Sequence, residues 1–139
     1  MRNSKPILLV EDDHGAARIF KRALEDLKIS DSLVHSVTCR EALEYLRGQN
    51  NKKPCIIITD LNTPDMDGFE FLRAVKADDV LRQIPVIVLS SSGTEEDINE
   101  SFRLSVAGYM VKPAGYEKLV GMLKTIHMYW TLSELPNGY

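Results

Sequence analysis

The sequence has little of what marks secreted, disulfide-rich or membrane-spanning proteins. Only two cysteines, one tryptophan and 7% aromatic residues occur among its 139 residues. Two cysteines without an apolar leader segment favour reduced thiols in a cytoplasmic protein. No apolar run approaches the roughly 20 residues that a membrane helix needs, so no membrane partner is expected.

The sequence also lacks an excess of positive charge. Its 17 Lys and Arg residues face 20 Asp and Glu residues, for a formal net charge of −3. Because nucleic acids and anionic membranes bind basic surfaces, neither is expected as a partner. The length fits one domain, which we assign to residues 1–130, with a tail at 131–139. We expect no DNA-binding domain, because only a short tail follows the last expected helix.

Strand-like apolar runs alternate with helical segments along the chain. Strands are expected near residues 6–10, 33–37, 54–60, 84–90 and 108–111. The expected helices cover residues 14–28, then begin near Thr38, Asp67 and Thr94, and end with residues 116–130. Five such units predict an α/β fold, a doubly wound five-stranded parallel sheet of flavodoxin-like order 2-1-3-4-5. Ile98 and Phe102 are expected on the apolar face of the fourth helix.

Polar residues follow the expected strands at their carboxyl ends. Asp60 closes the apolar run 54–60, and a carboxylate there must emerge from the core because burying it alone is costly. Glu11 and Asp12 follow the first strand, Ser90 ends the fourth, and Lys112 follows the fifth. Because open α/β sheets bind ligands at this edge, these side chains are expected to share one site.

The charges of this group predict its chemistry. Three neighbouring carboxylates repel one another, and Lys112 supplies only one positive charge. Carboxylate oxygens suit Mg²⁺, which commonly binds one or two carboxylates together with a substrate phosphate. Asp60 is the candidate nucleophile for an aspartyl phosphate. The Lys112 ammonium and the Ser90 hydroxyl are expected to bind the phosphoryl oxygens.

These residues resemble the receiver domain of bacterial two-component response regulators, of the chemotaxis-regulator-like kind. The likeness covers about residues 5–130 and four motifs in order: Leu8-Leu9-Val10-Glu11-Asp12-Asp13, Asp60-Leu61-Asn62-Thr63-Pro64-Asp65-Met66-Asp67-Gly68, Ser90, and Tyr109-Met110-Val111-Lys112-Pro113. The resemblance implies a signalling switch that takes a phosphoryl group from a histidine kinase on Asp60.

The resemblance also implies the ligands of the metal. Mg²⁺ would be bound by Asp12, Asp60 and the main-chain carbonyl of Asn62, with Glu11 nearby.

The resemblance further implies a switch. Ser90 and Tyr109 would couple phosphorylation to a change at the surface, and the Lys112–Pro113 bond is a candidate cis-proline bond.

The C-terminal segment narrows the resemblance. Met128-Tyr129-Trp130-Thr131-Leu132, followed by Leu135-Pro136, is similar to single-domain regulators that are paired with bacterial phytochrome kinases. A phytochrome-type histidine kinase is therefore the expected partner.

The last helix carries more apolar residues than one sheet-facing stripe needs. The surplus predicts a homodimer through helix 4, strand 5 and helix 5, or a tail that folds back over its own helix. The candidate dimer-face residues are Tyr116, Leu119, Met122, Leu123, Tyr129 and Trp130.

Two small residues bear on how long the signal lasts. Asn62 lies two positions after Asp60, and Ser92 lies two positions after Ser90. Because neither side chain is bulky, water should reach the phosphoryl group in line, and we expect a self-hydrolysing phosphoryl group. His14 is expected in solvent, and His35 is expected to be structural or on the surface.

Two other functions fit parts of the pattern. An Asp-nucleophile phosphatase of the haloacid-dehalogenase type needs a second Asp as general acid where this chain has Asn62. A flavin carrier on the same fold needs a phosphate-binding loop after the first strand, where this chain has the acidic residues Glu11 and Asp12.

Overall fold

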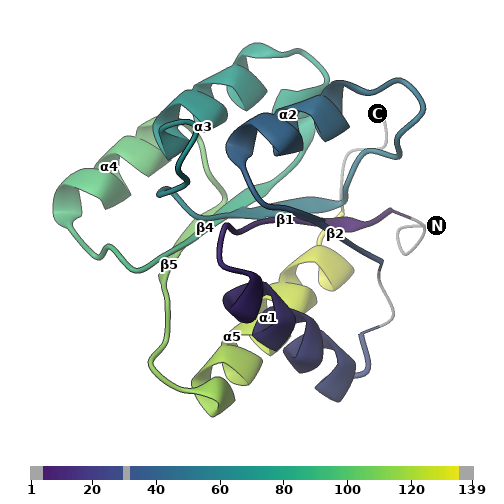
Figure 1. Ribbon diagram of the computed structural model, residues 1–139, viewed down its shortest axis with the longest axis vertical. Helices are drawn as coiled ribbons and strands as arrows, with labels where there is room; N and C mark the ends of the chain where they lie inside the picture. The colour runs from purple at the N-terminus through teal and green to yellow at the C-terminus, as the bar shows by residue number, and fades with distance from the viewer. Residues whose placement is uncertain (1–4, 30–31, 135–139) are drawn as a thin grey trace.

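Five parallel strands form one sheet at the centre of the molecule, in the order β2-β1-β3-β4-β5. The computed structural model describes residues 5–29 and 32–134, and Figure 1 shows helices on both faces of the sheet. The strands are β1 (Ile7–Val10), β2 (Leu33–Ser36), β3 (Ile56–Thr59), β4 (Val86–Ser90) and β5 (Gly108–Val111). This order confirms the predicted doubly wound, flavodoxin-like fold.

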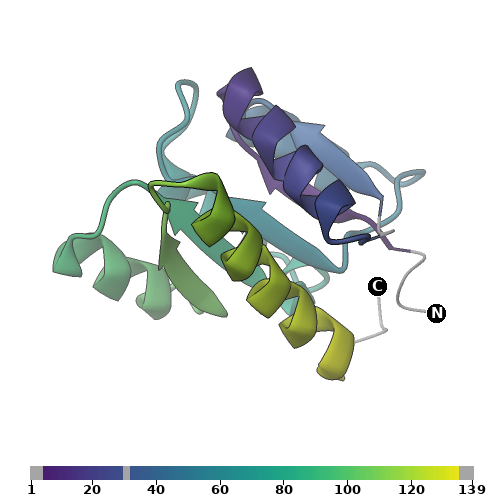
Figure 2. The ribbon, with the colours of Figure 1, turned by 90° about the horizontal axis from the view of Figure 1, so that it is seen from below.

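The helices divide into two layers. They are α1 (His14–Asp26), α2 (Cys39–Arg47), α3 (Gly68–Ala77), α4 (Glu95–Arg103) and α5 (Tyr116–Leu132), with a 3₁₀ turn, η2 (Leu81–Gln83), before β4. Helices α1 and α5 lie together on one face (Figure 2), and α2, α3 and α4 lie on the other (Figure 1). No helix within the described ranges is long and apolar enough to cross a membrane.

Alternation along the strands builds one core on each face of the sheet. In β1, Ile7 and Leu9 pack with the α1–α5 layer, whereas Leu8 and Val10 pack with the α2–α3–α4 layer. All four residues are buried, as expected for a strand with both faces covered. The strand ends are therefore the only places along β1 where a carboxylate reaches solvent without crossing a core.

Side-chain caps begin four of the helices. Asp13 Oδ1 accepts hydrogen bonds from Gly15 N and Ala16 N at the start of α1, at 2.8 and 3.2 Å. Thr38, Asp67 and Thr94 cap α2, α3 and α4 in the same way. These contacts satisfy backbone N–H groups that have no partner within the helix. Each of these caps lies at the end of a loop that leaves the carboxyl end of a strand.

The loop between β3 and α3 closes tightly after Asp60. A Cβ at Gly68 would lie 2.5 Å from both the Cα and the carbonyl oxygen of Leu61, so no other residue fits there. Gly68 N donates to Leu61 O at 3.0 Å. Asp65 in this loop accepts from Arg40 N in the first turn of α2 at 2.9 Å. The loop is thus fixed against both neighbouring helices.

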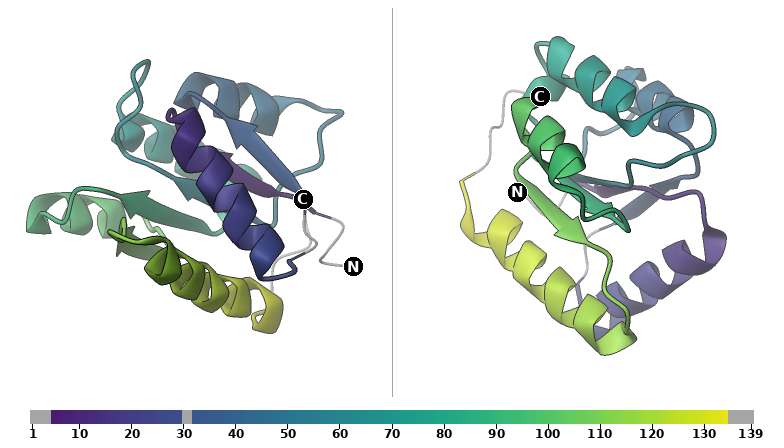
Figure 3. Two further views of the ribbon diagram at one scale, coloured as in Figure 1. Left: turned by 60° about the horizontal axis from the view of Figure 1, so that its bottom comes forward. Right: turned by 90° about the vertical axis from the view of Figure 1, so that its left-hand side faces the viewer.

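Helix α4 differs from the sequence-based expectation. Phe102, expected on its apolar face, is 51% exposed, and Ile98 is only half-buried. Ser101 is the one buried residue of the helix. Figure 3 (right) shows α4 beside β5, which is the edge strand of the sheet.

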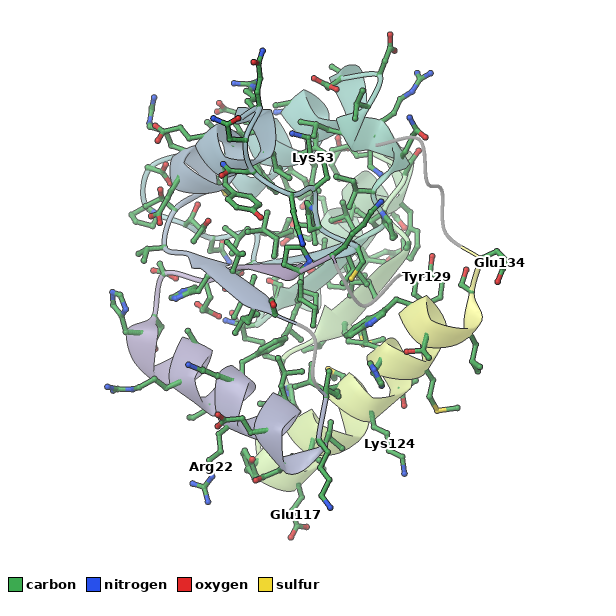
Figure 4. All side chains as sticks on the ribbon, turned by 90° about the vertical axis from the view of Figure 1, so that its right-hand side faces the viewer. Arg22, Lys53, Glu117, Lys124, Tyr129 and Glu134 are labelled. Carbon is green, nitrogen blue, oxygen red and sulfur yellow. The ribbon has the colours of Figure 1, made fainter. Side chains whose placement is uncertain are left out.

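Helix α5 corrects part of the predicted dimer face. Leu123 and Trp130 are 0% and 2% exposed and belong to the core beneath α1 and α5, so their assignment to a subunit interface is wrong. Tyr116, Leu119 and Met122 are half-buried against the same core, and Tyr129 is exposed. Glu117 and Lys124 point away from the sheet (Figure 4). The apolar stripe of α5 therefore packs into the chain's own core. The alternative prediction, a tail that folds back over α5, concerns residues 131–139, of which 135–139 lie outside the described residues.

Candidate functional site

Strand register brings the polar residues to one edge of the sheet. Val10 of β1 is paired with Thr59 of β3, so Glu11 and Asp60 leave the sheet at the same level. Lys112 N donates to Ser90 O at 2.7 Å, which sets Lys112 beside the end of β4. The parallel topology alone therefore collects residues that are up to 101 positions apart in the chain.

Asp60 is almost completely buried at this edge, with 6% of its surface exposed. Its Oδ1 accepts from Asn62 N at 3.1 Å, and its Oδ2 accepts from Lys112 Nζ at 2.8 Å. A buried carboxylate needs such partners to stay ionised. These two contacts fix the orientation of the side chain, one at each carboxylate oxygen.

Glu11 and Asp12 complete an acidic cluster with Asp60. One carboxylate oxygen from each residue lies within 4.8 Å of the others. Glu11 is buried like Asp60, whereas Asp12 is exposed, so the cluster opens to solvent on the Asp12 side. Three hard oxygen donors at this spacing fit a divalent cation such as Mg²⁺, which keeps several of its waters.

Lys112 partly neutralises the cluster. Its Nζ donates to Glu11 Oε1 and Asp60 Oδ2, each at 2.8 Å. Partial burial lowers the pKa of Lys112, but the hydrogen bonds and charges of Asp60 and Glu11 outweigh it, so the pKa is raised overall. The ammonium therefore stays charged at neutral pH. Three carboxylates against one ammonium leave negative charge that a bound cation can balance.

The Ser90 hydroxyl faces the loop between β4 and α4. Ser90 is fully buried, and its Oγ accepts from Ser92 N at 3.2 Å. Tyr109, half-buried against the α2–α3–α4 core, donates its hydroxyl to Ser92 O at 2.8 Å. Ser90 and Tyr109 are therefore both bonded to the backbone of Ser92. The structure connects the two predicted switch residues through this one residue.

One sequence-based prediction about the backbone is wrong. The described residues contain no cis peptide bond, so the Lys112–Pro113 bond is trans. The trans form is the more stable isomer of an X–Pro bond by about 0.5–1 kcal/mol. Lys112 nevertheless reaches both Glu11 and Asp60 from this backbone.

Two contacts at the edge of the site were not foreseen. His35 Nε2 lies 2.7 Å from the main-chain oxygen of Glu11. Ser92 Oγ donates to Asp97 Oδ2 in the first turn of α4 at 2.6 Å. Strand order could have placed His35 near Glu11, since β1 and β2 are neighbours, but the direction of its ring is not visible in the sequence.

Comparison with known proteins agrees with this geometry. A family model of the response regulator receiver domain matches residues 7–124. Response regulator Rcp1 of Synechocystis is 34% identical over 130 residues, which cover 91% of this chain and 88% of Rcp1. The protein named "Probable methanogenesis regulatory protein FilR2", of Methanothrix harundinacea, is 35% identical over 127 residues, or 89% of this chain and 82% of FilR2.

Solved structures show the same likeness. The phosphorylated cyanobacterial phytochrome response regulator RcpA aligns with a TM-score of 0.89 and 38% identity, covering 96% of this chain and 99% of that one. The Mn²⁺-bound form of Rcp1 aligns with a TM-score of 0.86 over 95% of this chain and 99% of that one. Given a family model that spans most of the sequence and relatives above 30% identity across nearly all of it, this chain belongs to the response regulator receiver domain family.

Proposed function

We propose that the protein is a two-component response regulator that accepts a phosphoryl group on Asp60 and signals through protein contacts. The observation that carries this proposal is the environment of Asp60. Its buried carboxylate shares Lys112 with Glu11, at 2.8 Å to each, beside an acidic cluster open to solvent. A carboxylate so held is oriented for attack on a phosphorus atom that approaches the rim.

The proposed reaction is transfer from a phosphohistidine of a histidine kinase. A carboxylate oxygen of Asp60 attacks the phosphorus, and the new P–O bond forms as the P–N bond breaks. The bonding electron pair leaves with the imidazole nitrogen. Lys112, already at the carboxylate, binds a phosphoryl oxygen, and Ser90 turns its hydroxyl toward another. The chain catalyses only its own phosphorylation and dephosphorylation.

Mg²⁺ is the proposed cofactor. Asp12, Asp60 and the main-chain carbonyl of Asn62 would hold it, with Glu11 beside it. The ion would offset the charge of the carboxylates and of the phosphoryl oxygens. The solvent-exposed side of the cluster, at Asp12, leaves room for water ligands.

The proposed partner is a histidine kinase of the phytochrome type, in the cytoplasm. RcpA, which this chain resembles across its length, is described as a phytochrome response regulator. A hollow of about 420 Å³ opens beside Lys112, between α1 and the loop that follows β5. Ile19, at its lining, is 48% exposed. An apolar surface next to the acceptor suits a protein donor better than a small phosphorylated metabolite.

The proposed output surface is the α4–β5–α5 side, including a homodimer. Phe102 on α4, Val111 on β5 and Tyr129 on α5 are all large and exposed. Phosphorylation would draw Ser90 toward the phosphoryl group and change its contact with Ser92, to which Tyr109 is bonded. Sedimentation with a phosphoryl mimic tests the dimer, and a monomer at high concentration in both states would contradict it.

We also propose that the phosphoryl group is short-lived. Asn62 is exposed next to the acceptor, and the Ser92 hydroxyl is bonded to Asp97. Neither side chain is bulky enough to shield the phosphorus from water. A phosphorylated form that persists for days with Mg²⁺ would refute this proposal.

The direct test is intact mass after incubation with acetyl phosphate and Mg²⁺. Wild type should gain the mass of one phosphoryl group, and Asp60→Asn should gain none. Asp65→Asn is a matched control because Asp65 lies in the same loop and its amide oxygen can still accept from Arg40 N. It should be modified like wild type. Equal modification of Asp60→Asn would refute the proposal.

A further inference from the structure

Glu11 is tethered at four of its polar atoms. Its N–H donates to Ser36 O at 3.0 Å, and its two carboxylate oxygens accept from Lys112 Nζ at 2.8 Å and Asp13 N at 3.3 Å. The fourth contact joins its main-chain oxygen to His35 Nε2 at 2.7 Å. Three of these contacts come from the backbone or from the site's own lysine. The fourth comes from a side chain with no role in the proposed phosphoryl transfer.

Only one of the two atoms in the His35–Glu11 hydrogen bond can be the donor. A carbonyl oxygen carries no proton, so His35 Nε2 must be the donor and must be protonated. The ring is held in place by its surroundings. His35 is half-buried on β2 opposite Leu9, and its ring meets the His14 ring edge to face, with centroids 5.9 Å apart. The imidazole therefore connects β2 with α1 and with the loop that carries Glu11 and Asp12.

The His35 hydrogen bond bears on the geometry of the acidic cluster because of where the accepting oxygen lies. The carbonyl of Glu11 belongs to the peptide unit that joins Glu11 to Asp12. That unit is planar and includes the Cα atoms of Glu11 and Asp12. A hydrogen bond to its oxygen therefore restrains the orientation of the plane from which both side chains project. This contact from β2 therefore contributes to the placement of two of the three carboxylates in the cluster.

We propose that His35 is a positioning residue for the divalent-cation site, holding Glu11 and Asp12 at the spacing the ion requires. The inference rests on the proposed Mg²⁺-dependent function. Outer hydrogen-bond partners of metal ligands typically alter metal affinity by about 10–100-fold when they are removed. His35 contacts the backbone of these residues and not their carboxylates, so an effect near the lower end, about tenfold, is expected.

The test compares two substitutions of similar length and shape. His35→Met removes the donor, and His35→Gln replaces it with an amide N–H₂ that reaches about as far. Mn²⁺ binding, followed by electron paramagnetic resonance of the free ion, is the readout. His35→Met should bind Mn²⁺ about tenfold more weakly than wild type, and His35→Gln should recover most of the loss. Saturating Mg²⁺ should restore phosphorylation of His35→Met by acetyl phosphate, since its acceptor is intact.

The outcomes separate this proposal from the one on which it rests. Unchanged or tighter Mn²⁺ binding by His35→Met, with normal binding by wild type, overturns the role of His35 alone. Wild type that does not bind Mn²⁺, or Asp12→Asn that binds as tightly as wild type, overturns the metal site itself. A measurement on wild type needs no variant: nitrogen NMR of the His35 ring should show a proton on Nε2. A ring protonated only on Nδ1 would overturn the proposal.

Discussion

Helices α4 and α5 both flank β5, yet they are attached to the sheet in different ways. Helix α5 buries Leu123, Ile126 and Trp130 in the core that it shares with α1. Helix α4 buries only Ser101 and leaves Phe102 half exposed. Because apolar burial contributes most of the free energy that holds a helix in place, α5 belongs to the stable core and α4 does not.

Polar contacts fasten α4 instead, and they lead back to the candidate site. Ser92 donates to Asp97 in the first turn of α4. The same Ser92 is bonded to Ser90 through its N–H and to Tyr109 through its carbonyl. A change at Ser90 therefore acts on the contacts of the less securely held helix. This asymmetry favours α4 over α5 as the element that responds to phosphorylation.

The largest effect should separate the two helices by stability. Leu123→Ala should lower the free energy of unfolding by about 3–5 kcal/mol, because it leaves a cavity beneath α5. Phe102→Ala, an equally drastic truncation on α4, should change it by no more than about 0.5 kcal/mol, as exposed substitutions do. Urea unfolding measures both. Similar losses in the two variants would end the distinction between the helices.

The ion-paired end of β5 should matter next. Lys112→Met leaves Glu11 and Asp60 without their ammonium partner, which should cost about 1.5–3 kcal/mol without Mg²⁺, a typical range for hydrogen bonds to charged groups. Adding Mg²⁺ should recover part of this loss by neutralising the same carboxylates. Thermal unfolding with and without Mg²⁺ measures both effects, and a variant as stable as wild type without Mg²⁺ contradicts this account.

The same pair has a defined pH dependence. The pKa of Lys112 is raised in the folded state, so its contribution is complete below the unfolded value of about 10.4 and is lost as pH rises through the folded value. The difference between wild type and Lys112→Met should therefore stay constant over neutral pH and shrink only in strong alkali. A difference that changes near pH 7 would contradict this assignment.

A smaller effect should be confined to α4. Ser92→Ala removes the hydroxyl that binds Asp97 and should cost about 1 kcal/mol. Amide exchange should become faster in the first turns of α4, while the amides of α5 keep the protection that global stability allows. Thr125→Ala, which removes an exposed hydroxyl of α5 that donates to Gly121 O at 3.1 Å, serves as the control. Equal acceleration in both helices after Ser92→Ala would show that they open together.

The smallest effect should be a gain in α5. Gly121 lies in the middle of this helix, and a Cβ there would meet no atom within 4 Å. Gly121→Ala should therefore raise the free energy of unfolding by about 0.5–1 kcal/mol through helix propensity alone. Chemical denaturation measures the gain. A loss measured in the dimeric protein would instead indicate that a second chain approaches closely at this glycine.

The sequence supported the fold because its signals were local and agreed with one another. Apolar runs such as residues 54–60 stand between helix caps such as Asp13 and Thr94, and right-handed crossovers leave few ways to connect them. Once the strand order followed, the meeting of Glu11, Asp12, Asp60 and Lys112 followed with it.

The errors concern which residues face solvent and how side chains turn. The expected packing of Phe102 is not observed: α4 lies beside the edge strand β5, and the Phe102 side chain is exposed. Leu123 and Trp130 were assigned to a dimer face because the stripe looked wider than one sheet face needs, yet both are in the core. The His35 and Ser92 contacts depend on side-chain directions that hydrophobic periodicity does not encode.

Amide hydrogen exchange before and after phosphorylation tests the account most directly. With acetyl phosphate and Mg²⁺, protection should change from Ser90 through α4, while the sheet-facing residues of α5 stay as they were. Asp60→Asn under the same conditions should show no change anywhere. Changes at the sheet-facing residues of α5 equal to those in α4, or an unaltered response in Asp60→Asn, would contradict an account in which Asp60 receives the signal and α4 reports it.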